Sequence, residues 1–141
     1  MDSPNVGPGV LFGAITMVAW GVWVVLGNAA SESIDPRTAA AISYVVAAAF
    51  AVVYVLASDA SLVVTPRGGL LAVVAGIFAA IGLISMYIGL SVGATATVST
   101  VGAMYFIVAS LIGIIVLGDE FTVRTAAGLA FAALGVVLIA R

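Results

Sequence analysis

The stretch that decides the fold is "GGLLAVVAGIFAAIGLISMYIGLSVGATATVSTVGAMYFIVASLIGIIVLG", residues 68–118, which contains no charged residue. As an α-helix at ~1.5 Å per residue, this run is more than twice as long as the ~30 Å hydrocarbon core of a bilayer is thick. It must therefore fold back once. The bend is expected in "SVGATATVST", residues 91–100, where small and hydroxylated residues cluster. The run thus predicts two membrane-spanning helices, near 70–90 and 98–117.

Charged residues separate the rest of the chain into similar apolar runs. Each run approaches the ~20 residues that a helix needs to cross a bilayer, and none alternates in the way that barrel strands do. The predicted fold class is therefore an all-α polytopic membrane protein with five transmembrane helices, forming a single domain over residues 1–141. The helices are expected near 9–30, 38–58, 70–90, 98–117 and 121–140.

Composition excludes several classes of function. The chain is 65% hydrophobic and 7% charged, and its net charge of −2 provides no basic patch for a nucleic acid. With no cysteine and no histidine, the chain offers no thiolate or imidazole metal site. No nucleophile–base pair or phosphate loop is present, so we expect neither an enzyme nor a cofactor. The expected partner is the lipid bilayer, and the expected location is the plasma membrane as a multi-pass protein.

The cores of the predicted spans contain no ionisable residue, which is the usual mark of a proton relay or an ion pathway. The small multidrug resistance family, whose members are of similar size, relies on a glutamate in the first helix, and this chain has none there. Proton-coupled efflux of cations by that route is therefore not expected.

The arginines do not favour one orientation in the membrane. With five spans, Arg67 and Arg124 lie on the N-terminal side and Arg37 and Arg141 on the opposite side. The rule that basic loops face the cytoplasm therefore gives a tie. A tie is also compatible with chance, so it gains weight only together with other observations.

The first predicted span carries an aromatic stripe. Gly13, Thr16, Trp20, Trp23 and Gly27 follow one another at intervals of three or four residues and so share one helix face. Tryptophan usually lies at the headgroup level, whereas Trp20 is near the centre of its span. A buried indole N–H needs an acceptor, so the stripe either lines a hydrated cavity that binds a solute or fills space between helices.

Other polar side chains could contribute to the same site. Tyr44, Tyr87 and Tyr105 are candidate substrate-binding residues, and each is also compatible with packing alone. Serines in the spans, Ser43 and Ser99 among them, could hydrogen-bond across helices, although bonding back to their own backbone is the more common outcome.

Small residues mark surfaces where helices can approach closely in lipid. Those that we expect in helix packing or at a dimer interface are Gly113, Gly128, Ala132 and Gly135. The sequence does not separate contacts within one chain from contacts between chains.

The last third of the chain resembles the end of the repeat unit in EamA-type transporters of the drug/metabolite transporter superfamily. In that unit a helix ends in Leu-Gly-Glu, a turn contains threonine, and the next helix has glycines seven apart. The matching residues here are Leu117, Gly118, Asp119, Thr122, Gly128 and Gly135, and Trp20 and Gly21 match the family's Trp-Gly in the first helix.

The chain departs from the family pattern at two positions. Asp119 replaces the family's glutamate, and Phe106 stands where a proline is often found in the fourth helix. Without that proline the fourth helix is expected to be straight.

The resemblance implies one half of an inverted-repeat transporter, because the usual family member has two such units in one chain. Such transporters build the substrate site between the two repeats. Together with the arginine tie, this predicts a half-size transporter that acts as a homodimer, with its copies inserted in opposite orientations (dual topology). The expected solute is small and either neutral or amphiphilic, moved by alternating access. The alternatives are a non-transporting membrane assembly subunit, half of a heteromeric transporter, and a dimer whose copies share one orientation.

Overall fold

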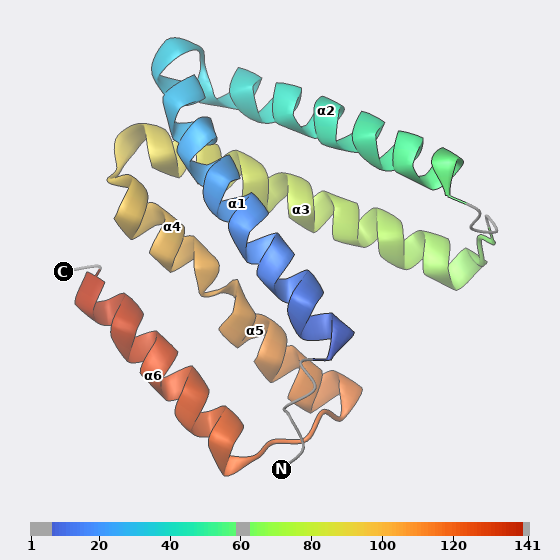
Figure 1. Ribbon diagram of the computed structural model, residues 1–141, viewed down its shortest axis with the longest axis vertical. Coiled ribbons are helices and arrows are strands. Elements are labelled where there is room, and N and C mark those ends of the chain that lie inside the picture. The colour runs from blue at the N-terminus through green and yellow to red at the C-terminus, as the bar shows by residue number, and fades with distance from the viewer. Residues whose placement is uncertain (1–6, 59–62, 140–141) are drawn as a thin grey trace. The chain divides into compact units, whose positions relative to one another are not determined.

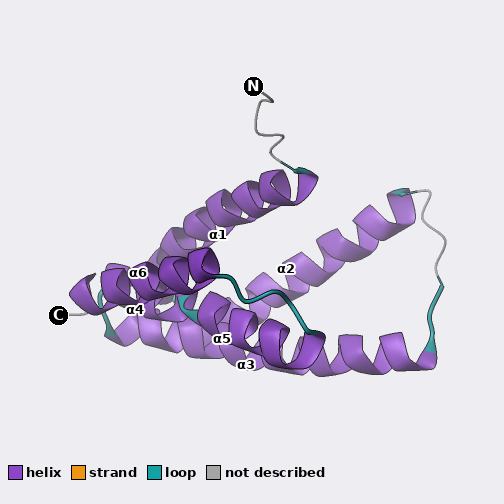
Figure 2. Cartoon of the chain, turned by 90° about the horizontal axis from the view of Figure 1, so that it is seen from below, coloured by secondary structure: helices purple, strands orange, loops and turns teal. Residues whose placement is uncertain are grey.

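The computed structural model describes residues 7–58 and 63–139. Within these ranges every regular element is helical, as the all-α prediction required (Figure 2). The elements in chain order are α1 (Pro8–Ser33), α2 (Pro36–Ala57), α3 (Pro66–Val92), α4 (Thr95–Ala103), α5 (Tyr105–Ile112), the π-helix η1 (Gly113–Leu117) and α6 (Val123–Ile139), labelled in Figure 1 except for η1.

Four candidate membrane spans are long and apolar: α1, α2, α3 and the segment Thr95–Leu117. The fifth helix, α6, has 17 residues. That length is at the lower limit of what crosses a bilayer. The bend in the long charge-free run falls between α3 and α4, inside the predicted segment 91–100.

Prolines and one carboxylate define where the helices begin. Pro8, Pro36 and Pro66 each stand at the first residue of their helix, where the missing N–H removes no intrahelical hydrogen bond. Asp35 caps α2, because its Oδ1 accepts hydrogen bonds from the backbone N–H groups of Arg37 at 2.9 Å and Thr38 at 3.3 Å. The first two spans are therefore joined by a very short, well-capped connection.

The prediction of a straight fourth helix is wrong. The helix is interrupted at Met104, where a backbone ψ of −5° tightens the turn. The Met104 N–H donates to the carbonyl of Val101, and the Ile107 N–H donates to the carbonyl of Met104, so both bonds span three residues. This 3₁₀-type turn replaces the α-helical pattern without any proline. The span then ends in the π-helix η1, which adds a second irregularity.

The chain consists of two compact units, Met1–Ser91 with α1 to α3 and Val92–Arg141 with α4 to α6. In the first unit, α1 and α2 run apart from their short connection (Figure 1). Tyr87 of α3 packs against the start of α2. The buried cluster there consists of Ala39, Ala40 and Tyr87. In the second unit, α4 packs against α6.

Candidate functional site

The first unit contains a cluster of three aromatic rings, Trp20, Trp23 and Tyr87, which we call the aromatic cluster. The indole rings of Trp20 and Trp23 have centroids 6.4 Å apart with an interplanar angle of 56°. The ring of Tyr87 meets Trp23 edge to face, at 5.6 Å and 66°. Both separations lie in the range in which aromatic pairs attract each other. Two helices that are distant in sequence, α1 and α3, therefore supply one continuous series of aromatic contacts.

Exposure decreases along this cluster. Trp20 is 53% exposed, Trp23 is half-buried and Tyr87 is only 2% exposed. Trp20 therefore presents about half of its side chain at the surface, whereas Tyr87 lies beneath the surface. The cluster therefore has an accessible end and a buried end.

The buried end is tied to α2 by a hydrogen bond. The Tyr87 hydroxyl lies 2.5 Å from the Ser43 Oγ. A tyrosine hydroxyl in an apolar interior requires such a partner. The sequence left two outcomes open for Ser43, and the structure shows the less common one, because its hydroxyl reaches Tyr87 of α3. Ser99 does follow the expected pattern and donates to the carbonyl of Thr95 at 2.6 Å.

Small residues make room for Tyr87. Gly27, the buried residue of α1, would place a Cβ only 3.2 Å from Tyr87 Cζ and 3.3 Å from its Oη. Ala39 and Ala40 of α2 complete the buried cluster. The one signal of this role in the sequence is that Gly27 continues the Trp20–Trp23 face by one more turn. No pattern in the sequence indicated that Tyr87 would lie opposite it.

The other predicted site residues are Thr16 and Tyr44 in the first unit and Tyr105 in the second. Thr16 is exposed on α1, and its hydroxyl donates to the carbonyl of Phe12 at 3.0 Å. Tyr44 is half-buried on α2, one residue after Ser43. Tyr105 begins α5 in the second unit and is exposed. Within the first unit, the three rings of the aromatic cluster come from α1 and α3.

The predicted packing residues occupy two kinds of environment. Gly113 is buried at the start of η1, against the carboxyl group of Asp119. On α6, Ala132 and Gly135 are half-buried and Gly128 is exposed, and a Cβ on either glycine would meet no atom within 4 Å.

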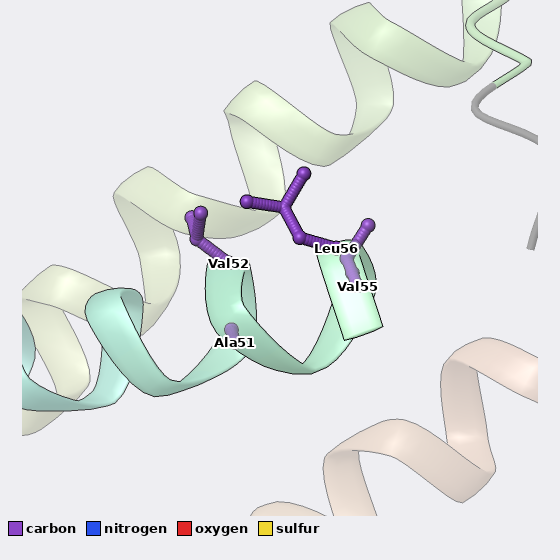
Figure 3. Close-up of a pocket in the computed structure, with 4 residues that line it drawn as sticks. All are labelled: Ala51, Val52, Val55 and Leu56. Atoms are coloured by element: carbon purple, nitrogen blue, oxygen red, sulfur yellow. The ribbon is translucent and has the colours of Figure 1, made fainter. Parts of the chain in front are cut away.

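The described residues offer no metal site and little charge. No group of three His, Cys, Asp or Glu side chains comes together in ranges 7–58 and 63–139. The ion pair found within them joins Asp35 and Arg37 at 3.5 Å on the surface. Figure 3 shows a shallow recess on α2, lined by Ala51, Val52, Val55 and Leu56. All four side chains are aliphatic and come from one helix, so the recess has no group that could orient a solute.

Comparison with known protein families identifies this architecture. The profile of the EamA-like transporter family matches residues 7–141, which is nearly the whole chain. The chain belongs to the EamA-like transporter family. Neither the curated proteins nor the solved structures include one that matches it. Membership in this family implies membrane transport and no enzymatic activity. The protein is therefore a multi-pass integral membrane protein, and its partners are lipid and a transported substrate.

The structure gives a physical reason for two residues that carry the EamA resemblance. Gly118 has a φ of 77°, a left-handed conformation that ends η1 and that side chains disfavour. Thr122 begins α6 as a cap, because its Oγ1 accepts the backbone N–H of Thr125 at 3.1 Å. The segment from Gly118 to Thr122 thus forms the turn between η1 and α6.

Proposed function

We propose that this EamA-like protein is a half-size transporter that moves a small neutral or amphiphilic solute across the plasma membrane by alternating access. The observation that carries the proposal is an aromatic surface at mid-span in a protein of a transporter family, with no charged group in any span core. A charged solute at membrane depth would need a compensating charge, and the spans supply none.

The half-exposed indole of Trp20 suits such a solute. Its flat, apolar face can pack against the apolar groups of such a solute. Thr16 lies one turn away on the same face of α1 and adds a small polar surface. The residues that we propose to line the solute pathway are Thr16, Trp20, Trp23, Tyr44 and Tyr105.

The solute site of an inverted-repeat transporter forms between two units near the midplane. We propose that a second copy of this chain supplies the second unit, inserted in the opposite orientation, and that α6 crosses the membrane as the fifth span. The equal division of the arginines supports this arrangement, because neither orientation gains from the positive-inside rule. The small face of α6 that includes Gly128, Ala132 and Gly135 is the proposed seam.

Uptake into proteoliposomes tests the function. The probes are a radiolabelled polyol, a zwitterionic amino acid and an uncharged aromatic amide, with the cation tetraphenylphosphonium for contrast. We expect saturable uptake of at least one uncharged or zwitterionic probe. Trp20→Ala should reduce this uptake by about tenfold, which corresponds to loss of one aromatic contact and some apolar burial.

Phe50→Ala is the matched control, because Phe50 is also an exposed aromatic residue of the first unit but lies on α2 away from the stripe. It should leave uptake unchanged, and both variants should retain their helical circular dichroism. Absence of uptake for every probe would overturn the proposal in favour of an assembly subunit or a heteromeric half. Uptake of the cation alone would overturn the assignment of a neutral solute.

A further inference from the structure

We propose that Tyr87 is a positioning residue, which fixes the indole of Trp23 and through it the solute-facing surface of Trp20, and that it does not contact the solute itself. This inference rests on the proposed function, because it assigns the internal organisation of the same site. It assigns Tyr87 a role different from that of Tyr44 and Tyr105, although the sequence indicated the same role for all three.

The first support is the hydrogen bond to Ser43. Hydroxyl groups in apolar helices usually bond to a carbonyl of their own helix. Six described serines and threonines do so here, namely Thr16, Ser31, Ser58, Ser91, Ser99 and Thr100. Ser43 instead bonds to Tyr87 across 44 residues of sequence. The Tyr87 hydroxyl is therefore engaged within the protein, where it ties α3 to α2.

The second support is the fit of the ring. Tyr87 is 2% exposed, and its ring lies directly against the backbone of α1 at Gly27. Ala39 and Ala40 of α2 are buried beside it. A group enclosed by three helices has little freedom to approach a solute, because closely packed interiors leave no unfilled volume for it to move into.

The third support is the direction of the aromatic contacts. Tyr87 contacts Trp23, and Trp23 contacts Trp20, so the order of contact runs from the buried end to the exposed end. An edge-to-face pair constrains both the position and the tilt of the second ring. Fixing Tyr87 therefore restricts the tilt of Trp23, which in turn limits the positions open to Trp20.

The chain provides its own reporter for this arrangement, because Trp20 and Trp23 are its two tryptophans. In a Trp20→Phe background the fluorescence comes from Trp23 alone. The measurement is the emission maximum of Trp23 and its quenching by acrylamide, a small neutral molecule, in proteoliposomes. It requires no knowledge of the transported solute.

Removing the ring of Tyr87 should make the side chain of Trp23 more mobile and more accessible. In Tyr87→Leu, we expect a shifted emission maximum and an increase of about twofold in the acrylamide quenching constant, because local packing opens. Tyr87→Phe and Ser43→Ala each remove the same hydrogen bond and should give smaller, equal changes. The double variant Ser43→Ala/Tyr87→Phe should change quenching no more than either single variant, because both act on one interaction.

Tyr54→Leu is the matched control, since Tyr54 is an exposed tyrosine of α2. Its Trp23 signal should match that of the background. Unchanged Trp23 emission and quenching in Ser43→Ala and Tyr87→Phe would overturn the proposal, even if Tyr87→Leu fails to fold. An equal change in Tyr54→Leu would also overturn it. If these signals change as expected while no probe is taken up, the transport proposal fails and the positioning role stands.

Discussion

At the scale of single residues, Gly113 shows how a missing side chain shapes the end of a span. Its carbonyl accepts the backbone N–H of Asp119 at 3.1 Å and also that of Gly118, so the chain reverses tightly over η1. The Asp119 carboxyl group then occupies the space that a Cβ on Gly113 would need. The π-helix, the left-handed Gly118 and the bare Cα of Gly113 are therefore parts of one turn.

Gly113→Ala should consequently destabilise the protein only slightly. The new methyl group overlaps the Asp119 carboxyl group, but Asp119 is exposed and its carboxyl group can rotate towards solvent, so the cost should be about 1 kcal/mol or less. Combining it with Asp119→Ala should recover part of that loss, because the clashing carboxyl group is gone. The measurement is unfolding in a denaturing detergent, followed by far-ultraviolet circular dichroism, for both single variants and the double variant.

Gly128→Ala provides the control for helix propensity. A Cβ at Gly128 meets nothing within 4 Å, and alanine favours a helix over glycine by ~1 kcal/mol. This variant should therefore be as stable as the original chain or slightly more stable. Strictly additive effects of Gly113→Ala and Asp119→Ala would show that the two positions do not interact.

At the scale of helices, the spacing of charged residues predicted four long apolar spans, but not their irregularities. The apolar runs also predicted the place of α6, which is shorter than the other spans, because a helix must cover the hydrocarbon core before a charge can occur. The break at Met104 was missed, because it arises from backbone hydrogen bonding in a segment without proline. Local tightening of this kind leaves no periodic signal.

The candidate site, like the helices, could be predicted only in part from the sequence. Spacing alone placed Trp20 and Trp23 on one face, because helical geometry determines which residues share a side. It could not determine which residue of another helix would meet that face. The bond between Ser43 and Tyr87 depends on the packing of α2 against α3, so it became visible only in the structure.

The small face of α6 leads to a prediction about assembly. A Cβ at Gly128 or Gly135 meets no atom within 4 Å in the chain, so we expect the fold of the monomer to tolerate a leucine at each position. If a partner copy packs on this face, Gly128→Leu/Gly135→Leu should separate the backbones and weaken the dimer by an order of magnitude or more in Kd. The dimer fraction is measured by single-molecule photobleaching in liposomes over a range of protein-to-lipid ratios.

Ala130→Leu is the matched control for this test. Ala130 is exposed on α6, two residues and therefore about half a turn from Gly128. It should leave the dimer fraction unchanged. An equal loss of dimer in both variants, or in neither, would place the contact elsewhere on the protein.

At the scale of the whole molecule, the small number of charged residues affects both the orientation of the chain in the membrane and the kind of solute that we propose it carries. In the proposed five-span arrangement the four arginines divide equally between the two sides, and the spans have no ionisable core residue. A protein with so small an orientation bias should respond strongly to a single added charge, because each basic residue near a span end contributes to the topology decision. The same scarcity leaves the solute pathway to aromatic and hydroxyl groups.

Glu120→Lys and Ala94→Lys add a basic residue on opposite sides of the five-span arrangement. Each should therefore fix one orientation, and the two orientations should be opposite. Since the chain has no cysteine, Ser3→Cys introduces a unique site for a membrane-impermeant maleimide. Labelling of intact cells should reach about half of the unbiased molecules, nearly all of one biased variant and nearly none of the other.

A dimer of oppositely oriented copies requires that both orientations of the chain are present in the same membrane. Each biased variant expressed alone should lose solute uptake, since a site between inverted units needs one copy of each orientation. Co-expression of the two should restore uptake, and co-expression of either with its own Trp20→Ala derivative should not. Labelling of the unbiased protein from one face only would contradict dual topology. Full uptake by a single biased variant would show that the functional partner shares its orientation, because in that case no inverted copy contributes to the site.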